Sequence, residues 1–133
     1  MRIIDTVVLL AYLDKEDPRH DKAVDYIFDI GLRQDIFVPS VTLLELDLEL
    51  KAHRVPYETR DSAHSRMARL IPQNRVTPLT SAILGRATKL SRLATWRSSY
   101  FDTLIAATGL EFGAESAITT DRNFSKLGIE PVF

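Results

Sequence analysis

Four carboxylate side chains, Asp5, Glu45, Asp102 and Asp121, stand at positions from which they could meet at one edge of a sheet. Asp5 and Asp121 each come at the carboxyl end of an apolar run that is typical of a strand. Carboxylates that lie close together repel one another, and a divalent cation is the natural counter-charge. Oxygen ligands favour Mg²⁺ or Mn²⁺, and such an ion activates a water for attack on a phosphodiester. The four acids therefore indicate metal-dependent phosphodiester hydrolysis that needs no protein nucleophile.

Three of the four acids also have a purely structural interpretation. Asp102 precedes an apolar helical pattern and suits a helix N-cap, and Asp121 in Thr-Thr-Asp-Arg-Asn suits an Asx turn. Glu45 is one of three acids that alternate with leucines and could belong to a solvated face. Asp5 has few structural roles directly after a buried strand, so it is the strongest candidate of the four.

Short apolar runs alternate along the chain with segments of helical spacing. We expect strands at residues 2–5, 36–38, 75–77, 116–119 and 131–133. We expect helices from Val7 onward and over residues 20–31, 41–53, 57–71, 80–93 and 104–113. Strands separated by helices pair in parallel. The predicted fold class is α/β, with a central parallel sheet flanked by helices in three layers, and residues 1–133 are predicted to form a single domain.

The segment 41–53 has two possible readings, because its leucines alternate with acids in a strand-like period of two. Leucine and glutamate are good helix formers, and the β-branched residues fade after Thr42. The composition favours a helix that places Glu45 near the end of the preceding strand. Ser40 is the expected N-cap of this helix, and Thr80 that of the helix over 80–93.

The composition excludes several classes of protein. The chain has 133 residues, 45% of them hydrophobic, and no cysteine, so disulfide scaffolds, thiolate zinc sites and cysteine nucleophiles are excluded. Its apolar runs are shorter than a membrane span, so we expect a cytoplasmic protein with no membrane association. The glycines form no phosphate-binding loop and the histidines no metal pair.

The charge distribution points to an anionic polymer as substrate. The net charge is −1, yet residues 51–97 carry ten Lys and Arg against two Asp and Glu. Basic side chains along neighbouring phosphates would complement an acidic catalytic edge, and aromatic rings could stack on bases. The candidates for contact with such a polymer are Arg54, Arg60, Arg66, Arg69, Trp96, Arg97 and Tyr100. The alternatives are solvated helix faces for the arginines and a core or dimer-interface role for the aromatics.

Four motifs in order along the chain carry a family resemblance. They are Ile3-Ile-Asp-Thr-Val-Val-Leu-Leu-Ala-Tyr-Leu13, Val38-Pro-Ser-Val-Thr-Leu-Leu-Glu45, Phe101-Asp-Thr-Leu-Ile-Ala-Ala107 and Ile118-Thr-Thr-Asp-Arg-Asn-Phe124. With these motifs the chain resembles PIN-domain ribonucleases, and most of all the VapC-type toxins of prokaryotic toxin–antitoxin pairs. The resemblance extends over nearly the whole chain.

The resemblance implies a PIN-like fold and a set of roles. Asp5, Glu45, Asp102 and Asp121 would be the catalytic cluster that holds Mg²⁺ or Mn²⁺. Thr6 and Thr119 would give polar support. Asn123 stands where the family often has another acid, and it offers a carbonyl oxygen without a charge. A second metal position would therefore lack one charged ligand.

The resemblance also implies partners: an RNA substrate, a cognate antitoxin whose tail enters the groove, and a second copy in a homodimer. Two other functions are open at this point. One is a non-catalytic PIN module that binds RNA or a protein, which Asn123 would favour. The other is a nuclease for RNA processing or DNA flaps, which would differ in its substrate.

Overall fold

A five-stranded parallel sheet forms the centre of the computed structural model, which describes residues 1–93 and 100–133. The strand order is β3-β2-β1-β4-β5. The strands are β1 (Arg2–Ile4), β2 (Ile36–Pro39), β3 (Val76–Thr77), β4 (Ser116–Ile118) and β5 (Glu130–Val132). In the register, Ile3 of β1 lies opposite Phe37 of β2 on one side and Ala117 of β4 on the other. The first strand of the sequence is therefore the central strand of the sheet.

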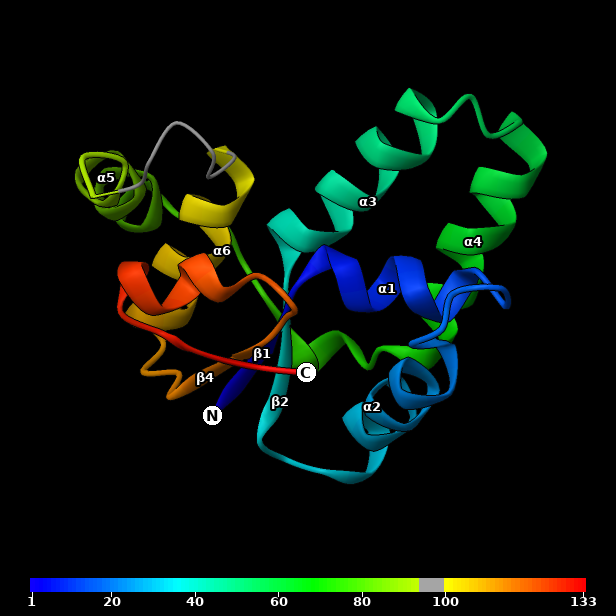
Figure 1. Cartoon of the computed structure of the whole chain (residues 1–133), viewed down its shortest axis with the longest axis horizontal. Helices are drawn as coiled ribbons and strands as arrows, with labels where there is room; N and C mark the ends of the chain where they lie inside the picture. The colour runs from blue at the N-terminus through cyan, green and yellow to red at the C-terminus, as the bar shows by residue number, and fades with distance from the viewer. Residues whose placement is uncertain (94–99) are drawn as a thin grey trace.

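Six α-helices and two 3₁₀ helices are present in the described residues. The α-helices are α1 (Thr6–Leu13), α2 (His20–Leu32), α3 (Ser40–Ala52), α4 (Tyr57–Leu70), α5 (Ser81–Leu90) and α6 (Tyr100–Glu111). The 3₁₀ helices are η1 (Gln73–Arg75) and η2 (Arg122–Leu127). Figure 1 shows α5 and α6 on one side of the sheet, α1 and α2 on the other, and the α3–α4 hairpin extending from the sheet edge.

Both faces of the sheet are buried, because parallel strands joined by helices are covered on each side. Ile3 and Ile4 are both fully buried, and their side chains belong to different cores. Ile3 packs with residues of α5 and α6, and Ile4 with residues of α1, α2 and α4. This alternation explains why the strand runs are apolar without a period of two, and it confirms the three-layer α/β fold.

The helix boundaries differ from the expected ones at three points. Pro39, not Ser40, precedes the first turn of α3 as its N-cap, because the strand continues through the proline, so the prediction for Ser40 is wrong. The helix expected to reach Leu93 ends at Leu90. Asp102 lies inside the first turn of α6 and is not its N-cap. The segment 41–53 is helical as predicted, and Thr80 caps α5 by accepting from the Ile83 N–H.

No helix within residues 1–93 or 100–133 has both the length and the hydrophobicity that crossing a membrane would require.

Candidate active site at the carboxyl ends of the strands

Asp5 is a buried carboxylate at the point where β1 becomes α1. It is the N-cap of α1, and its Oδ1 accepts from the Thr6 N–H at 2.7 Å. Its Oδ2 accepts from the Thr119 hydroxyl at 2.6 Å. The side chain is only 6% exposed. Burial raises the pKa of Asp5 to about 6, with the charges of Asp102 and Asp121 adding to the effect and the hydrogen bonds from Thr119 and Thr6 opposing it.

Glu45 reaches the same place from the second turn of α3. Its carboxylate accepts a hydrogen bond from the hydroxyl of Thr6, which is itself buried. The pKa of the half-buried Glu45 is raised to about 7, mainly by burial and also by the nearby charges of Asp5 and Asp102, while the hydrogen bond from Thr6 opposes the rise. The structure therefore brings Glu45, Asp5 and Asp102 within electrostatic reach of one another.

Asp121 follows β4 and begins η2. Its Oδ1 accepts from the backbone N–H of Asn123 at 2.8 Å and from the Asn123 side-chain amide at 2.9 Å. Its own N–H donates to the Thr119 hydroxyl at 3.0 Å. The Asx-turn interpretation of Asp121 is therefore correct. The same turn holds Asp121 near Asp5, and the charge of Asp121 raises the pKa of Asp5. Asn123 uses its amide group to hold Asp121 in place.

Asp102 lies half-buried in the first turn of α6. The charge of Asp102 raises the pKa of both Asp5 and Glu45. The first turn of α6 therefore lies near the beginnings of α1 and α3. All four acids thus come from the elements at the carboxyl ends of the central strands, where Figure 1 shows α1 and α3 beginning side by side.

The donor set has the chemistry that a hard divalent cation requires. Carboxylate and hydroxyl oxygens are the ligands of Mg²⁺ and Mn²⁺, and the pKa values of Asp5 and Glu45 are raised first by burial and then by the neighbouring acids. Within residues 1–93 and 100–133, no three His, Asp or Glu side chains are spaced as a ready-made metal site. The residues fit such an ion by their chemistry, and the coordination geometry is not formed in this arrangement of side chains.

The basic and aromatic candidates have different surroundings. Tyr100 is 56% exposed at the start of α6, two residues before Asp102. Arg54 is exposed in the turn between α3 and α4, where its φ is 56°. Arg60 donates to the Asp47 carboxylate at 3.2 Å. Trp96 and Arg97 lie outside the described residues.

Sequence reasoning missed Thr42, a fully buried residue in the first turn of α3. Its hydroxyl donates to the carbonyl of Ile4, the last residue of β1, at 3.0 Å. The signal for it was its position three residues before Glu45, which places both side chains on one face of the helix.

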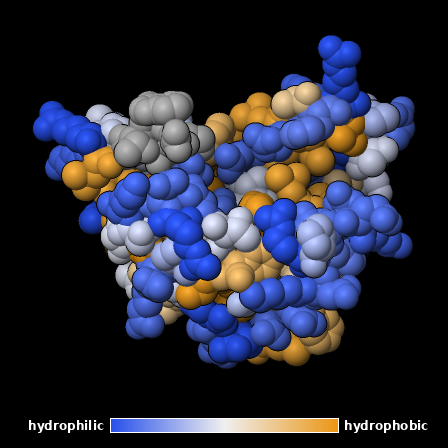
Figure 2. Space-filling view, in the orientation of Figure 1, coloured by the Kyte–Doolittle hydropathy of each residue, from blue (hydrophilic) through white to orange (hydrophobic). Residues whose placement is uncertain are grey.

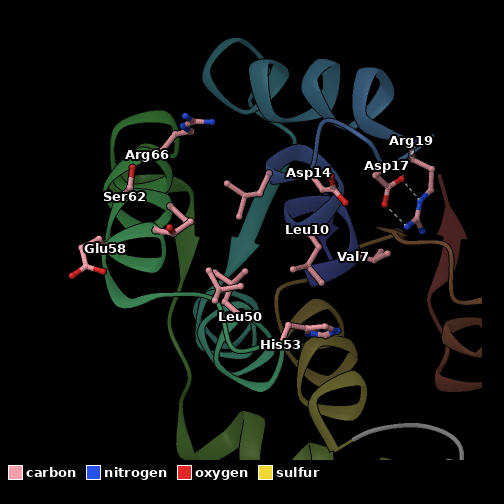
Figure 3. Close-up of a pocket in the computed structure, with 14 residues that line it drawn as sticks. Val7, Leu10, Asp14, Asp17, Arg19, Leu50, His53, Glu58, Ser62 and Arg66 are labelled. Carbon is pink, nitrogen blue, oxygen red and sulfur yellow. Dashed lines mark hydrogen bonds and ion pairs between the residues drawn. The ribbon is translucent and has the colours of Figure 1, made fainter.

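A cavity of about 800 Å³ lies next to this site, between α1, α3 and α4. Figure 3 shows apolar side chains such as Val7, Leu10 and Leu50 pointing into it, with charged side chains such as Glu58 and Arg66 at its rim. None of the four acids lines this cavity. In the space-filling view, hydrophobic surface is seen over the region of α1 and α3, bordered by hydrophilic atoms (Figure 2).

Comparison with known proteins supplies a family model and a set of similar folds. The model described as PIN domain matches residues 2–130. No curated protein sequence matches the chain.

Three solved structures are similar in fold. FitAcB from Neisseria gonorrhoeae has a TM-score of 0.75 at 18% identity, with 100% of this chain and 97% of that chain covered. Mycobacterium tuberculosis VapC20, described as a sarcin-ricin loop cleaving toxin, has a TM-score of 0.75 at 21% identity, with 97% and 96% covered. VapBC2 from Rickettsia felis, bound to a DNA fragment from their promoter, has a TM-score of 0.72 at 14% identity, with 98% and 96% covered.

Proposed function

Because the chain belongs to the PIN domain family, we propose that it is an endoribonuclease that hydrolyses RNA phosphodiester bonds with Mg²⁺ or Mn²⁺. The observation that carries this proposal is the meeting of Asp5, Glu45, Asp102 and Asp121, in which each of the first two acids has a raised pKa. Acids that repel one another in a buried place are costly to a fold, so their presence together calls for a function.

Each residue would have a defined part in the reaction. The bound ion would lower the pKa of a water and neutralise charge on the scissile phosphate. Asp5 and Asp121 would hold the ion, with Asp102 and Glu45 as further ligands. Thr119 orients Asp5 and Asp121, since its hydroxyl donates to the Asp5 carboxylate and accepts from the Asp121 N–H. Because the pKa of Glu45 is raised to about 7 in the metal-free protein, binding of the ion by Glu45 would depend on pH near neutrality.

The proposal is tested by cleavage of total RNA with Mg²⁺, with Mn²⁺ and with EDTA. We expect discrete fragments that require the metal and that disappear in Asp5→Asn and in Asp121→Asn. The matched control is Asp25→Asn, the same chemical change at an exposed position of α2. Full activity in the two site variants, or no cleavage by folded native protein with either metal, would refute the assignment.

Asn123 favours a second candidate, a non-catalytic module that binds RNA or a protein partner. Its amide donates to Asp121, so this position adds no negative charge to the site. A binding module would show no rise in melting temperature with Mn²⁺, whereas the proposed enzyme would, because a ligand that binds the folded state stabilises it. The rates at which one preparation cleaves RNA and DNA flaps are compared to distinguish a ribonuclease from a flap nuclease. Faster cleavage of RNA favours the ribonuclease.

We further propose that the protein is the toxin of a toxin–antitoxin pair and that its antitoxin covers the cavity in Figure 3. Similar folds include a toxin–antitoxin complex from Klebsiella pneumoniae, with a TM-score of 0.62 at 15% identity over 91% of this chain and 87% of that one. The apolar floor and the rim with charges of both signs suit an amphipathic helix.

Co-purification with a small protein encoded beside this gene tests the partner and its place. Ser62→Arg would fill the cavity that Ser62 lines, and we expect it to abolish co-purification. Ser65→Arg makes the same change at an exposed residue of α4, about one turn further along, that does not line the cavity. This variant should still co-purify with the partner. Equal co-purification of both variants would place the partner elsewhere.

The predicted homodimer has a candidate surface on α3. Leu44 and Leu48 are 52% and 43% exposed on the same helix as Glu45, and exposed leucines at this spacing are typical of an interface. We propose that this face contacts a second copy. Light scattering on native protein and on a Leu44→Arg/Leu48→Arg variant tests it, since the double variant should have half the native mass.

A further inference from the structure

The bond from Thr42 to β1 lies where the first two strands separate. The register of β1 with β2 extends to Ile3 and Phe37. The Asp5 N–H donates to the Ile118 carbonyl of β4 at 3.2 Å. Successive residues of a strand direct their backbone groups to opposite sides, so the Ile4 carbonyl is directed toward β2. There it accepts from the Thr42 hydroxyl at 3.0 Å, in place of a partner on the strand.

The hydrogen bond from the Thr42 hydroxyl thus connects α3 to Ile4, the residue just before Asp5. The N-cap of α3 is Pro39, whose side chain makes no cap hydrogen bond. The fully buried Thr42 hydroxyl therefore fixes the first turn of this helix against the end of β1. A helix held at its first turn carries the side chain three residues later to a defined place, and that side chain is Glu45.

A second polar contact links Thr42 to the residue that follows Asp5. The Thr6 hydroxyl, which donates to Glu45, lies 3.4 Å from the Thr42 carbonyl oxygen. Thr6 is the first residue of α1, directly after Asp5. The backbone and side chain of Thr42 therefore contact the residues on either side of Asp5, while its helix presents Glu45 to the same hydroxyl.

We propose that Thr42 is a positioning residue, whose hydroxyl sets the place of Glu45 relative to Asp5 and so the ability of the pair to hold a divalent cation. This inference rests on the proposed function. Valine has nearly the shape of threonine and cannot donate, so Thr42→Val would leave the Ile4 carbonyl buried without its partner. Serine retains the donor.

The first experiment measures Mn²⁺ affinity by calorimetry in the absence of RNA. We expect Thr42→Val to bind Mn²⁺ about 10- to 100-fold more weakly than the native protein, the range seen when a residue that orients metal ligands is lost. Thr42→Ser should restore most of the affinity. The matched control is Thr108→Val, which removes another buried hydroxyl that donates to a carbonyl of its own helix at 2.8 Å. An affinity of Thr42→Val equal to the native one would overturn the inference and leave the ribonuclease proposal standing.

The second experiment needs no metal, so it tests whether Thr42 positions Glu45 even if the native protein binds no Mn²⁺ and the proposed function fails. Urea unfolding midpoints are compared for Thr42→Val, Glu45→Gln and the double variant. Residues that depend on one another give non-additive shifts, and independent residues give additive ones. Additive shifts for this pair, as expected for Thr108→Val with Glu45→Gln, would show that Thr42 is structural only.

Discussion

Replacement of Asp5 by asparagine should stabilise the metal-free protein at neutral pH. The Asp5 carboxyl is 6% exposed, and its pKa is raised from 3.8 to about 6 by burial and by neighbouring acids. At pH 7.5 the group is ionised in both the folded and the unfolded chain. The folded chain then holds a charge that its surroundings disfavour.

The magnitude follows from the pKa shift. A shift of about 2 units corresponds to about 3 kcal/mol of unfolding free energy that is lost as the pH rises from about 4 to about 6. Asparagine can still accept from the Thr6 N–H, but the Thr119 hydroxyl loses a charged acceptor, which offsets about 1 kcal/mol or more. We expect a net gain of about 1–2 kcal/mol for Asp5→Asn at pH 7.5, or a rise in melting temperature of about 3–7 °C for a domain of this size.

Thermal and urea unfolding in EDTA at pH 7.5 and at pH 4 would measure this effect. At pH 4 the folded native protein carries a protonated Asp5, so the advantage of Asp5→Asn should largely vanish. Asp25→Asn, at an exposed position, should change little at either pH. A variant less stable than native protein at pH 7.5, or a gain of equal size at pH 4, would refute the reasoning that an uncompensated buried charge is present in this site.

Three further predictions follow from other contacts. The Mn²⁺ affinity should rise from pH 5.5 to a plateau above about 7, because Glu45 must lose its proton to hold the ion; a flat calorimetric profile would contradict its role. Thr119→Val should lower the unfolding free energy by about 1–3 kcal/mol at pH 7.5, and less at pH 4 where Asp5 is neutral, as urea titration would show. Gly109→Ala should lower the unfolding free energy by about 1–3 kcal/mol, because its methyl group would lie 2.6 Å from a side-chain carbon of Ile3 in β1. Gly85→Ala, in open space on α5, should raise the unfolding free energy by up to about 1 kcal/mol, and melting temperatures equal to that of the native protein would refute both expectations.

The sequence alone was sufficient for the fold class and for the order of strands and helices. Local apolar runs and helical spacing are properties of neighbouring residues, so the five strands and six α-helices of residues 1–93 and 100–133 could be placed without tertiary information. The meeting of Asp5 and Asp121 was also predictable, because the carboxyl ends of parallel strands share one edge of the sheet. Helix ends were less predictable, as Ser40 shows, because a strand that runs through Pro39 moves the cap by one residue.

The tertiary structure decided which polar groups touch. Thr42 bonds to a carbonyl 38 residues away, and Thr119 to a carboxylate 114 residues away. Such contacts depend on how the helices pack on the sheet, within a few tenths of an ångström, and no pattern of neighbouring residues encodes that distance. The pairing of Arg60 with Asp47 and the cavity beside α1 have the same origin. The residue types and their order along the chain thus specified an acidic edge, and only the packing of α3 against the end of β1 determined which hydroxyls hold its carboxylates in place.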